Sequence, residues 1–225
     1  WGSNMAATRL QAMPEIINAR KSGKKIVLID VCGEAMSKYC DKTILIRPGT
    51  DGALALAMMN VLVKEGSADE EFLDNNAEGY REFKETLSEY TPKWAENITG
   101  IASETIIELA LEYGKAYAPA IILGSGNSRY GNGAMTVRLI TILSLFTGAW
   151  KKKGGGLCGC TPIDTSYINL SLIKRPDFRK EPSKKININQ LGTAVNDKNI
   201  KSLYVYGSNP VNSVSNTTAV VEGLK

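Results

Sequence analysis

Three short polar turns in this chain share one kind of chemistry. Two follow an apolar run, the third opens the chain after Trp1, and all combine glycine and serine with a nearby asparagine: Gly2-Ser3-Asn4, Gly124-Ser125-Gly126 and Gly207-Ser208-Asn209. Glycine lets the backbone approach a ligand closely, and unbonded N–H groups at the start of a following helix attract negative charge. The turns therefore predict a site for an anionic, nucleotide-bearing ligand, and the alternative is that they are ordinary tight turns.

Two aspartates are placed so that their carboxylates could accept hydrogen bonds from a bound nucleotide. Asp30 ends an apolar run 28 residues after Gly2, and a carboxylate at roughly 20 residues from a glycine turn commonly binds ribose hydroxyls. Asp51, in "PGTD", could accept two N–H donors from a guanine edge, because an ionised carboxylate accepts at both oxygens. Each could instead cap a helix, and Asp30 could also be a surface charge.

Composition indicates a soluble globular protein and argues against a nucleic-acid-binding or membrane-spanning one. The chain has 225 residues, 43% hydrophobic and 22% charged, which is typical of a soluble globular protein. The net charge of +4 comes from scattered lysines, so we expect no nucleic-acid surface. No apolar run is long enough to cross a bilayer. The sequence favours the cytoplasm and leaves export open.

Neither a catalytic residue nor a metal ligand can be assigned. The chain has no histidine, the usual acid–base residue and metal ligand. Its four cysteines are too few and too unevenly spaced for a disulfide framework or a complete metal site: Cys32, Cys40, Cys158 and Cys160. We expect small buried or loop thiols instead.

Strand-like and helix-like runs alternate along the chain. Short apolar runs predict buried strands, and longer runs predict helices that cover them. The strands are expected at 24–30, 42–47, 120–124 and 202–207, and the helices at 5–20, 34–40, 50–66 and 132–148. The fold class is therefore α/β, a doubly wound, mostly parallel sheet of a Rossmann-like variant, whose first strand would precede Trp1.

Three regions are expected within this fold. Residues 1–66 form the first half of a dinucleotide-binding α/β domain, 67–117 a helical insertion, and 118–225 the second half. In the insertion, Ser67 to Glu70 reads as a capping box, Thr91 precedes a proline at a helix start, and Ser103 reads as a cap. Residues 151–200 contain "KKKGGGLCGC" and little periodicity, which predicts a long irregular loop.

Taken in order, these segments resemble the molybdopterin oxidoreductase family, which includes formate dehydrogenases, nitrate reductases and dimethyl sulfoxide reductases. The segments are "WGSN", "LID", "IRPGTDGALALAM", "GSGNSRYGNG", "LFTGAWKKKGGG" and "YGSNPVNS", and they span essentially the whole chain. The segments "IRPGTDGALALAM" and "YGSNP" are quite specific, whereas the glycine-rich segments alone would be a weak signal. The resemblance implies two molybdopterin guanine dinucleotides around one molybdenum or tungsten, which transfer an oxygen atom or an electron pair.

The resemblance also implies a role for each turn. Gly2, Ser3 and Asn4 would bind one pyrophosphate and Asp30 its ribose, while the next turn would meet its guanosine through Gly49, Thr50 and Asp51. Gly124, Ser125 and Gly126 would face the centre of the cofactor. The second dinucleotide would lie against the last turn and a serine beyond it: Gly207, Ser208, Asn209 and Ser213.

The expected function is that of a cofactor-binding fragment of a molybdenum or tungsten oxidoreductase. In the family a 4Fe-4S cluster and the protein ligand to the metal lie upstream of "WGSN", so we expect this segment to ligate neither and to be inactive alone. Its partners would be the rest of its own polypeptide and an iron–sulfur electron-transfer subunit. Val31-Cys32-Gly33 departs from the Pro-Arg that usually follows the strand-end aspartate, and no proline follows Asn4.

Two other functions stay open at this point. The altered residues after Asp30 would suit a cofactor-free structural or electron-transfer subunit of the same fold. A simple Rossmann-type nucleotide-binding enzyme would need G-x-G-x-x-G, whereas Gly124 and Gly126 begin that spacing without completing it.

Overall fold

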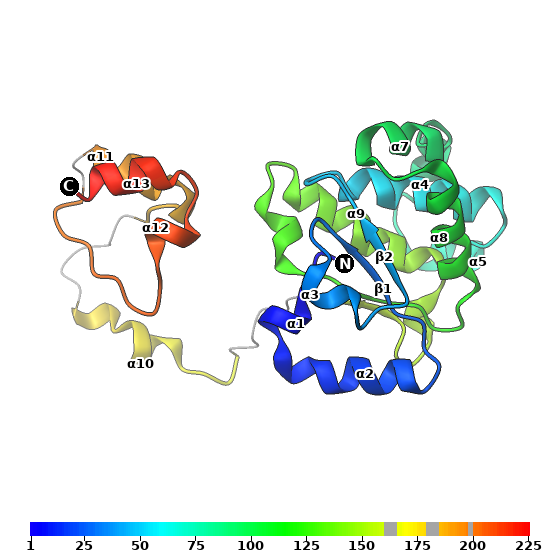
Figure 1. Cartoon of the computed structure of the whole chain (residues 1–225), viewed down its shortest axis with the longest axis horizontal. Helices are drawn as coiled ribbons and strands as arrows, with labels where there is room; N and C mark the ends of the chain where they lie inside the picture. The colour runs from blue at the N-terminus through cyan, green and yellow to red at the C-terminus, as the bar shows by residue number, and fades with distance from the viewer. Residues whose placement is uncertain (160–165, 179–184, 198–199) are drawn as a thin grey trace. The chain divides into compact units, whose positions relative to one another are not determined.

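A computed structural model describes residues 1–159, 166–178, 185–197 and 200–225 (Figure 1). Its contacts divide the chain into two compact units, Trp1–Pro162 and Ile163–Lys225. The first unit is mixed α/β, and the described part of the second is helical. Among the described residues, no helix has the length and apolar character needed to cross a membrane.

The first unit contains two parallel pairs of strands. β1 (Val27–Asp30) pairs with β2 (Lys42–Leu45), and β3 (Ala120–Ile122) pairs with β4 (Gly156–Cys158). The sequence predicted β1, β2 and β3 within a few residues. It missed β4, which lies in the stretch expected to be irregular.

Trp1 and Gly2 connect the two pairs through backbone hydrogen bonds. The nitrogen of Trp1 donates to the carbonyl of Ile122 at 2.7 Å, and the N–H of Gly124 donates to the carbonyl of Trp1 at 2.8 Å. On the opposite side, the N–H of Gly2 donates to the carbonyl of Ile29 at 2.8 Å. These two residues therefore lie between the edges of β1 and β3.

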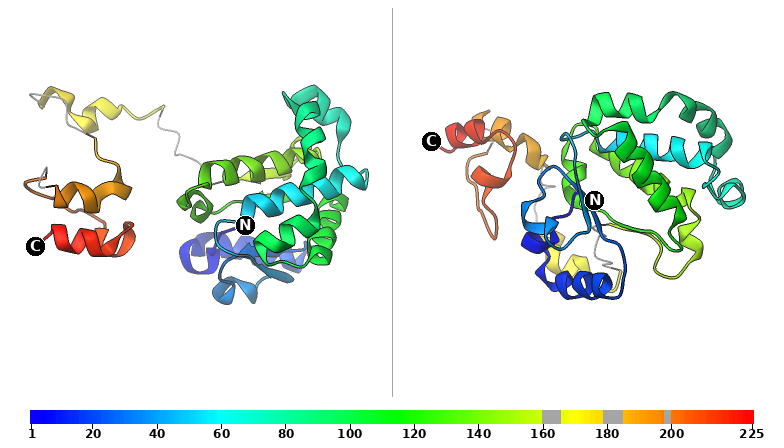
Figure 2. Two further views of the ribbon diagram at one scale, coloured as in Figure 1. Left: turned by 90° about the horizontal axis from the view of Figure 1, so that it is seen from above. Right: turned by 45° about the vertical axis from the view of Figure 1, so that its right-hand side comes forward.

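Helices cover both faces of the strands, because successive side chains of a strand point to opposite faces. Leu28 packs with the layer formed by α1 (Met5–Thr8), α2 (Met13–Lys21) and α3 (Glu34–Ser37). Ile29 and Ile121 belong to the larger core, which includes α4 (Asp51–Lys64), α8 (Ser103–Lys115) and α9 (Gly133–Phe146). Figure 2 shows the two helical layers on either side of the strands.

The helix expected over 5–20 is broken into three pieces. α1 ends at Thr8, because the next residue, Arg9, has a φ of −142°, which is not helical. A short 3-10 turn, η1 (Leu10–Ala12), then precedes α2. Pro14 lies at the start of α2. Because proline has no N–H to donate and its ring collides with the preceding turn, a continuous helix through this position is unfavourable.

α4 and α9 are buried, as their nearly continuous apolar character predicts. Leu54 and Leu62 of α4 and Leu143 of α9 have no exposed surface. Asn60 is a polar exception in α4: it is 2% exposed, its Nδ2 donates to the carbonyl of Leu87 at 2.6 Å, and its Oδ1 has no partner among the described residues.

The stretch 67–117 is helical, as expected, although two of its caps differ. It contains α5 (Glu70–Asn76), α6 (Tyr80–Thr86), η2 (Leu87–Glu89), α7 (Pro92–Thr99) and α8. Thr91 caps α7 by accepting the N–H of Trp94, which confirms the prediction. Asp69, not Ser67, caps α5, and Ser103 is the first residue of α8 rather than its cap.

The described part of 151–200 is more regular than predicted. Besides β4 it holds the last residue of η4 (Ala149–Lys151), followed by α10 (Leu170–Lys174), η5 (Pro176–Phe178), η6 (Ile188–Gln190) and α11 (Leu191–Asn196). α12 (Pro210–Ser213) and α13 (Thr217–Gly223) complete the second unit. α11 packs on α13 through glycines: a Cβ on Gly192 would lie 2.9 Å from Cβ of Ala219.

The strand predicted at Ser202–Gly207 is not present. This segment has no strand assignment, and Leu203, Tyr204 and Tyr206 are exposed. An isolated apolar run becomes a strand only when another strand edge pairs with it, and the described part of the second unit offers none. Together with the two separate strand pairs, this leaves a mixed α/β fold with small parallel sheets.

Candidate functional site

The turn Trp1–Asn4 holds two kinds of polar group at the carboxyl end of β1. Gly2 has a φ of +58°, and its N–H is already bonded to Ile29. The N–H groups of Ser3 and Asn4 have no acceptor in the described part of the chain. Oδ1 of Asn4 is buried without a partner there. The donors available to a ligand are therefore those of Ser3 and Asn4, rather than that of Gly2.

The turn after β3 lies directly against the first one. A Cβ on Gly124 would lie 1.7 Å from the carbonyl oxygen of Gly2, which only glycine can accommodate. The N–H of Gly124 is bonded to Trp1. The 3-10 helix η3 (Ser125–Arg129) follows, and the first N–H groups of such a helix have no partner within it.

Asn127 completes this contact, and sequence reasoning did not assign it a role. It is 4% exposed, and its Nδ2 has no partner among the described residues. Its side chain lies beside Gly2, where a Cβ would come within 2.6 Å of its Oδ1. The asparagine in "GSGN" was visible in the sequence, but only the fold shows that it is buried.

Asp30 ends β1 at the same end of the strands. It is 9% exposed, and its Oδ1 accepts the N–H of Cys32 at 3.1 Å. One oxygen thus stabilises the turn that leaves the strand. Asp30 can offer its other oxygen to a hydroxyl group.

The turn before α4 is tied to the turn after β3. Gly49 has a φ of +78°, and its carbonyl accepts Nδ2 of Asn132 at 2.9 Å. The hydroxyl of Thr50 donates to the carbonyl of Arg47 at 2.7 Å. That hydroxyl therefore stabilises its own turn, and Gly49 keeps the turn close to residues 130–132.

Asp51 is buried and has one partner. It is 2% exposed, and its Oδ1 accepts the indole N–H of Trp1 at 2.7 Å. Its Oδ2 is buried with no partner among the described residues. Burial raises the pKa of the Asp51 carboxyl above its ordinary value, the hydrogen bond from Trp1 opposes that shift, and the nearby Asp30 adds to it.

The pairing of Asp51 with Trp1 changes what Asp51 can do. The sequence predicted that both oxygens could receive donors from a guanine edge. In the structure the indole occupies Oδ1, so only Oδ2 is left without a donor among the described residues. The tryptophan before the glycine turn was part of the recognised segment, and its bond to a residue 50 positions away appears only in the fold.

The predicted turn of the second unit is more exposed. Gly207 has a φ of +59°, and no atom of the described residues lies within 4 Å of its Cβ position. Asn209 caps α12, with its Oδ1 accepting the N–H of Asn212 at 3.3 Å, and Ser213 donates its hydroxyl to the carbonyl of Asn209 at 2.7 Å. The hydroxyl of Ser213 is therefore engaged within the turn, while Ser208 is exposed.

The described residues contain no group of three or more His, Cys, Asp or Glu side chains that could hold a metal ion. Cys32 and Cys158 are exposed and Cys40 is buried. Cys160 lies outside the described residues.

Three turns that are far apart in the sequence thus meet in the first unit. Their buried polar atoms without a partner in the described part of the chain include two acceptors, on Asn4 and Asp51, and one donor, on Asn127. A buried polar atom costs free energy unless it is hydrogen-bonded. The arrangement can therefore bind a ligand that carries donors and acceptors as well as an anion.

Parallel strands with helices on both faces, and polar glycine turns at their carboxyl ends, are typical of proteins that bind nucleotide-bearing cofactors. The chain matches the molybdopterin oxidoreductase family over residues 1–225. The chain belongs to that family, as the resemblance of its turns indicated.

Proteins similar to this chain include several oxidoreductases. It is 38% identical to the probable oxidoreductase YoaE of Bacillus subtilis over all of this chain and 33% of the relative. It is 31% identical to the F420-dependent formate dehydrogenase subunit alpha of Methanocaldococcus jannaschii, over all of this chain and 36% of that protein. The chain therefore spans about a third of the length of these relatives.

A solved structure shares part of the fold. Acetylene hydratase from Pelobacter acetylenicus aligns with a TM-score of 0.59 and 27% identity, covering 62% of this chain and 19% of that one. Its name describes a hydration, whereas the names of the other relatives describe oxidoreductases.

Proposed function

We propose that this chain holds the guanine dinucleotide part of a molybdopterin cofactor in a molybdenum or tungsten oxidoreductase. When bound in the complete enzyme, the cofactor supplies two-electron or oxygen-atom transfer at its metal. The observation that carries the proposal is a set of buried polar atoms without partners among the described residues, on Asn4, Asp51 and Asn127. These residues belong to three turns that contact one another.

Each turn has a distinct role in this proposal. The N–H groups of Ser3 and Asn4 bind the pyrophosphate, and the carboxylate of Asp30 accepts a ribose hydroxyl. Oδ2 of Asp51 accepts a donor from the guanine edge, while Trp1 holds Oδ1 and so fixes the orientation of the carboxylate. The N–H groups of Gly2 and Gly124 are already hydrogen-bonded to Ile29 and Trp1. These glycines contribute instead by having no side chain, which lets the two turns approach each other.

Further parts of the proposal concern the complete protein. The backbone bonds of Trp1 and Gly2 support one doubly wound sheet in the order β2, β1, Trp1–Gly2, β3, β4. A second dinucleotide is held by the turn Gly207–Asn209 with Ser213. The metal ligand, a 4Fe-4S cluster and any iron–sulfur electron-transfer subunit lie outside this segment, which is inactive by itself.

The test uses the complete gene product that carries this chain. We expect it to contain molybdenum or tungsten and to release guanine nucleotide on acid hydrolysis. Asp51→Asn removes the negative charge and replaces one carboxylate oxygen with an amide NH₂ group. Hydrogen bonds to charged groups contribute about 1.5–3 kcal/mol. We therefore expect roughly 10- to 100-fold weaker retention of guanine nucleotide during dialysis.

A matched control and two contrary outcomes complete this test. Asp41→Asn changes an exposed carboxylate that pairs with Arg20 and should leave nucleotide content unchanged. Equal retention by Asp51→Asn and the unmodified protein would show that Asp51 does not contact guanine. A protein that contains neither metal nor guanine nucleotide in molybdenum- and tungsten-replete cells would instead favour a cofactor-free structural or electron-transfer subunit.

A further inference from the structure

Arg47 lies at the start of the short turn that leads into α4. It follows Ile46, which is 4% exposed and whose N–H donates to the carbonyl of Asp30 at 3.1 Å. Asp51, the proposed guanine contact, is the first residue of α4. Residues 47–50 therefore connect a buried position at the end of β2 to a buried helix, and whatever holds Arg47 helps to fix the place of Asp51.

Arg47 donates hydrogen bonds to the C-terminal end of α7. Its N–H bonds to the carbonyl of Thr99 at 3.0 Å, and its Nη1 bonds to the carbonyls of Asn97 and Ile98 at 2.9 and 3.4 Å. These are the last three carbonyls of the helix, which have no partner within it. A positive charge at this end also interacts favourably with the helix dipole. Arg47 therefore caps a helix that belongs to the stretch 67–117.

The chain just after α7 leaves room for the guanidinium of Arg47. Gly100 has a φ of +77°, which favours glycine, and a Cβ there would lie 3.2 Å from Nε of Arg47. The hydroxyl of Thr99 donates to the carbonyl of Ala95 at 2.8 Å and accepts the N–H of Ile101 at 3.1 Å. The side chain of Thr99 thus stabilises the same end of the helix that Arg47 contacts.

α7 is held in the core of the first unit. Ala95 has no exposed surface, and Thr99 and Ile101 are 1% and 5% exposed. Ala95 and Ile101 belong to the same cluster of buried side chains as Leu54 of α4. Because a close-packed interior resists displacement, α7 is a fixed point to which the turn 47–50 is attached.

The carbonyl of Arg47 links this fixed point to the turn. It accepts the hydroxyl of Thr50 at 2.7 Å and the N–H of Thr50 at 3.2 Å. The carbonyl of Gly49 accepts Nδ2 of Asn132 at 2.9 Å. The turn is thus held at Arg47 by α7 and at Gly49 by the residue before α9.

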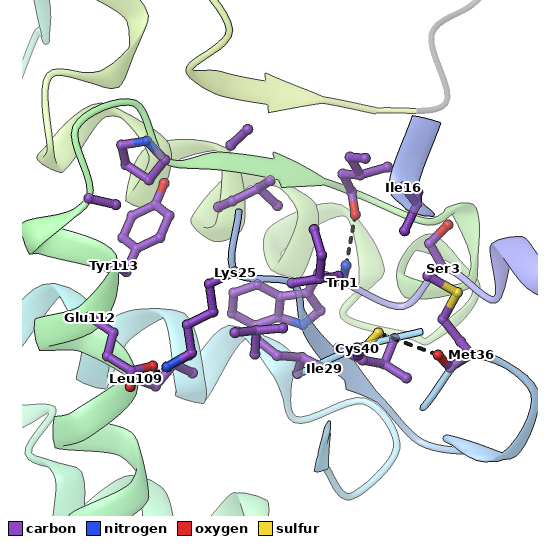
Figure 3. Close-up of a pocket in the computed structure, with 18 of the residues that line it drawn as sticks. Trp1, Ser3, Ile16, Lys25, Ile29, Met36, Cys40, Leu109, Glu112 and Tyr113 are labelled. Carbon is purple, nitrogen blue, oxygen red and sulfur yellow. Dashed lines mark hydrogen bonds and ion pairs between the residues drawn. The ribbon is translucent and has the colours of Figure 1, made fainter. Parts of the chain in front are cut away.

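Asp51 can follow little movement of this turn without losing its own partner. Its Oδ1 accepts the indole N–H of Trp1 at 2.7 Å. Trp1 packs in the core with Ile29, and both line a cavity of about 260 Å³ (Figure 3). Since Trp1 is held independently of the turn, a shift of residues 47–50 would lengthen its bond to Asp51 and change the direction of Oδ2.

We propose that Arg47 is a positioning residue for Asp51, and that the helical stretch 67–117 contributes to the cofactor site through the contact between α7 and Arg47. The inference rests on the proposed contact of Asp51 with guanine. A direct bond from Arg47 to a phosphate is the alternative, and it is disfavoured because the N–H and Nη1 of Arg47 already bond to α7.

Hydrogen exchange of the complete gene product that carries this chain, read by mass spectrometry, tests the anchoring without a nucleotide assay. Arg47→Ala should speed exchange in a peptide covering 48–55 on the order of 5-fold, because a charge at a helix end and a hydrogen bond each contribute modestly. A peptide covering 57–64, in the middle of α4, should not change. Arg47→Lys keeps the charge and should restore part of the protection. Arg81→Ala is the matched control, an exposed arginine of the same stretch that bonds to Asp74.

Retention of guanine nucleotide during dialysis, measured in a double-mutant cycle with Asp51→Asn, tests whether Arg47 acts through Asp51. Arg47→Ala alone should weaken retention by roughly 5-fold, for the same reason. The double variant should lose less than the product of the two single losses, because groups that act through one another are not additive. A role confined to the stability of α7 would give losses that multiply.

The two measurements separate the possible failures. Unchanged exchange in 48–55 with Arg47→Ala would overturn the proposal, because Arg47 would then not hold the turn. Losses of nucleotide that multiply would also overturn it, since Arg47 would act independently of Asp51, as a direct contact with a phosphate would. If Asp51→Asn alone leaves retention unchanged, the guanine contact itself is wrong, and exchange in 48–55 then decides the anchoring of the turn by itself.

Discussion

The contact between Gly124 and Gly2 gives the sharpest test of how the turns are assembled. Gly124 has an ordinary extended backbone, with φ −79° and ψ 150°, so alanine would not be strained by its own dihedral angles. The added Cβ would nevertheless lie 1.7 Å from the carbonyl oxygen of Gly2 and 2.4 Å from its carbonyl carbon. Backbone cannot rotate away as a side chain can, so Gly124→Ala must displace one of the two turns.

The cost of that displacement can be estimated from two contributions. Overpacking typically costs about 1–3 kcal/mol. Moving the turns also weakens the bonds that join Trp1 to Gly124 and Ile122, each of which contributes about 0.5–1.5 kcal/mol. We expect Gly124→Ala to lower the free energy of unfolding by about 2–5 kcal/mol, equivalent to roughly 5–15 °C in Tm for a unit of this size.

The assay is urea denaturation followed by tryptophan fluorescence. All three tryptophans, Trp1, Trp94 and Trp150, lie in the first unit, so the signal reports on that unit. Gly126→Ala is the matched control, because it lies two residues away and its Cβ would meet only one atom, at 3.8 Å. If the two variants unfold at the same urea concentration, the close approach of the two turns is not a property of the protein in solution.

Three further predictions concern charges and caps. Because burial raises the pKa of Asp51, the native state holds its proton to a higher pH than the unfolded chain, and unfolding free energy should fall as pH rises above about 4. Asp51→Asn should remove that part of the pH dependence in urea titrations. If the unfolding free energy of Asp51→Asn varied with pH as it does in the unmodified protein, the carboxyl would not be buried as described. Asp69→Ala should lower the unfolding free energy by about 1 kcal/mol, since Asp69 caps α5, whereas Asp69→Asn keeps the cap and loses only the exposed ion pair with Lys151, a change within about 1 kcal/mol. Thr91→Ala should cost about 1 kcal/mol and Ser103→Ala much less, which thermal unfolding can compare directly.

Local patterns in the sequence predicted most of the first unit. The apolar runs gave β1, β2 and β3, and the long apolar stretches gave the buried helices α4 and α9, because burial on all sides requires such composition. Strand β4 was missed: its three residues lie among glycines and pair only with β3, so its signal is not local. The run 202–207 shows the opposite error, since apolar character alone does not supply a partner edge.

The site was predictable as a set of turns but not as a set of atoms. The glycines and polar residues identified Gly2, Asp51 and Gly124, and the fold brings their turns together. Which atoms remain available depends on contacts over long sequence distances, such as the indole of Trp1 occupying one oxygen of Asp51. The burial of Asn127 has the same origin, because it results from the approach of two turns more than 100 residues apart.

Asn60 has a consequence for the direction in which Asp51 points. Helix α4 is so uniformly apolar that hydrophobic burial would change little if the helix turned about its axis. The hydrogen bond from Asn60 to the carbonyl of Leu87 favours a single rotation of the helix. It also has a free-energy cost, because Oδ1 of Asn60 is buried without a partner among the described residues. Asp51 is the first residue of the same helix. By fixing the rotation of α4 about its axis, the buried amide of Asn60 therefore also sets the direction in which the Asp51 carboxylate points.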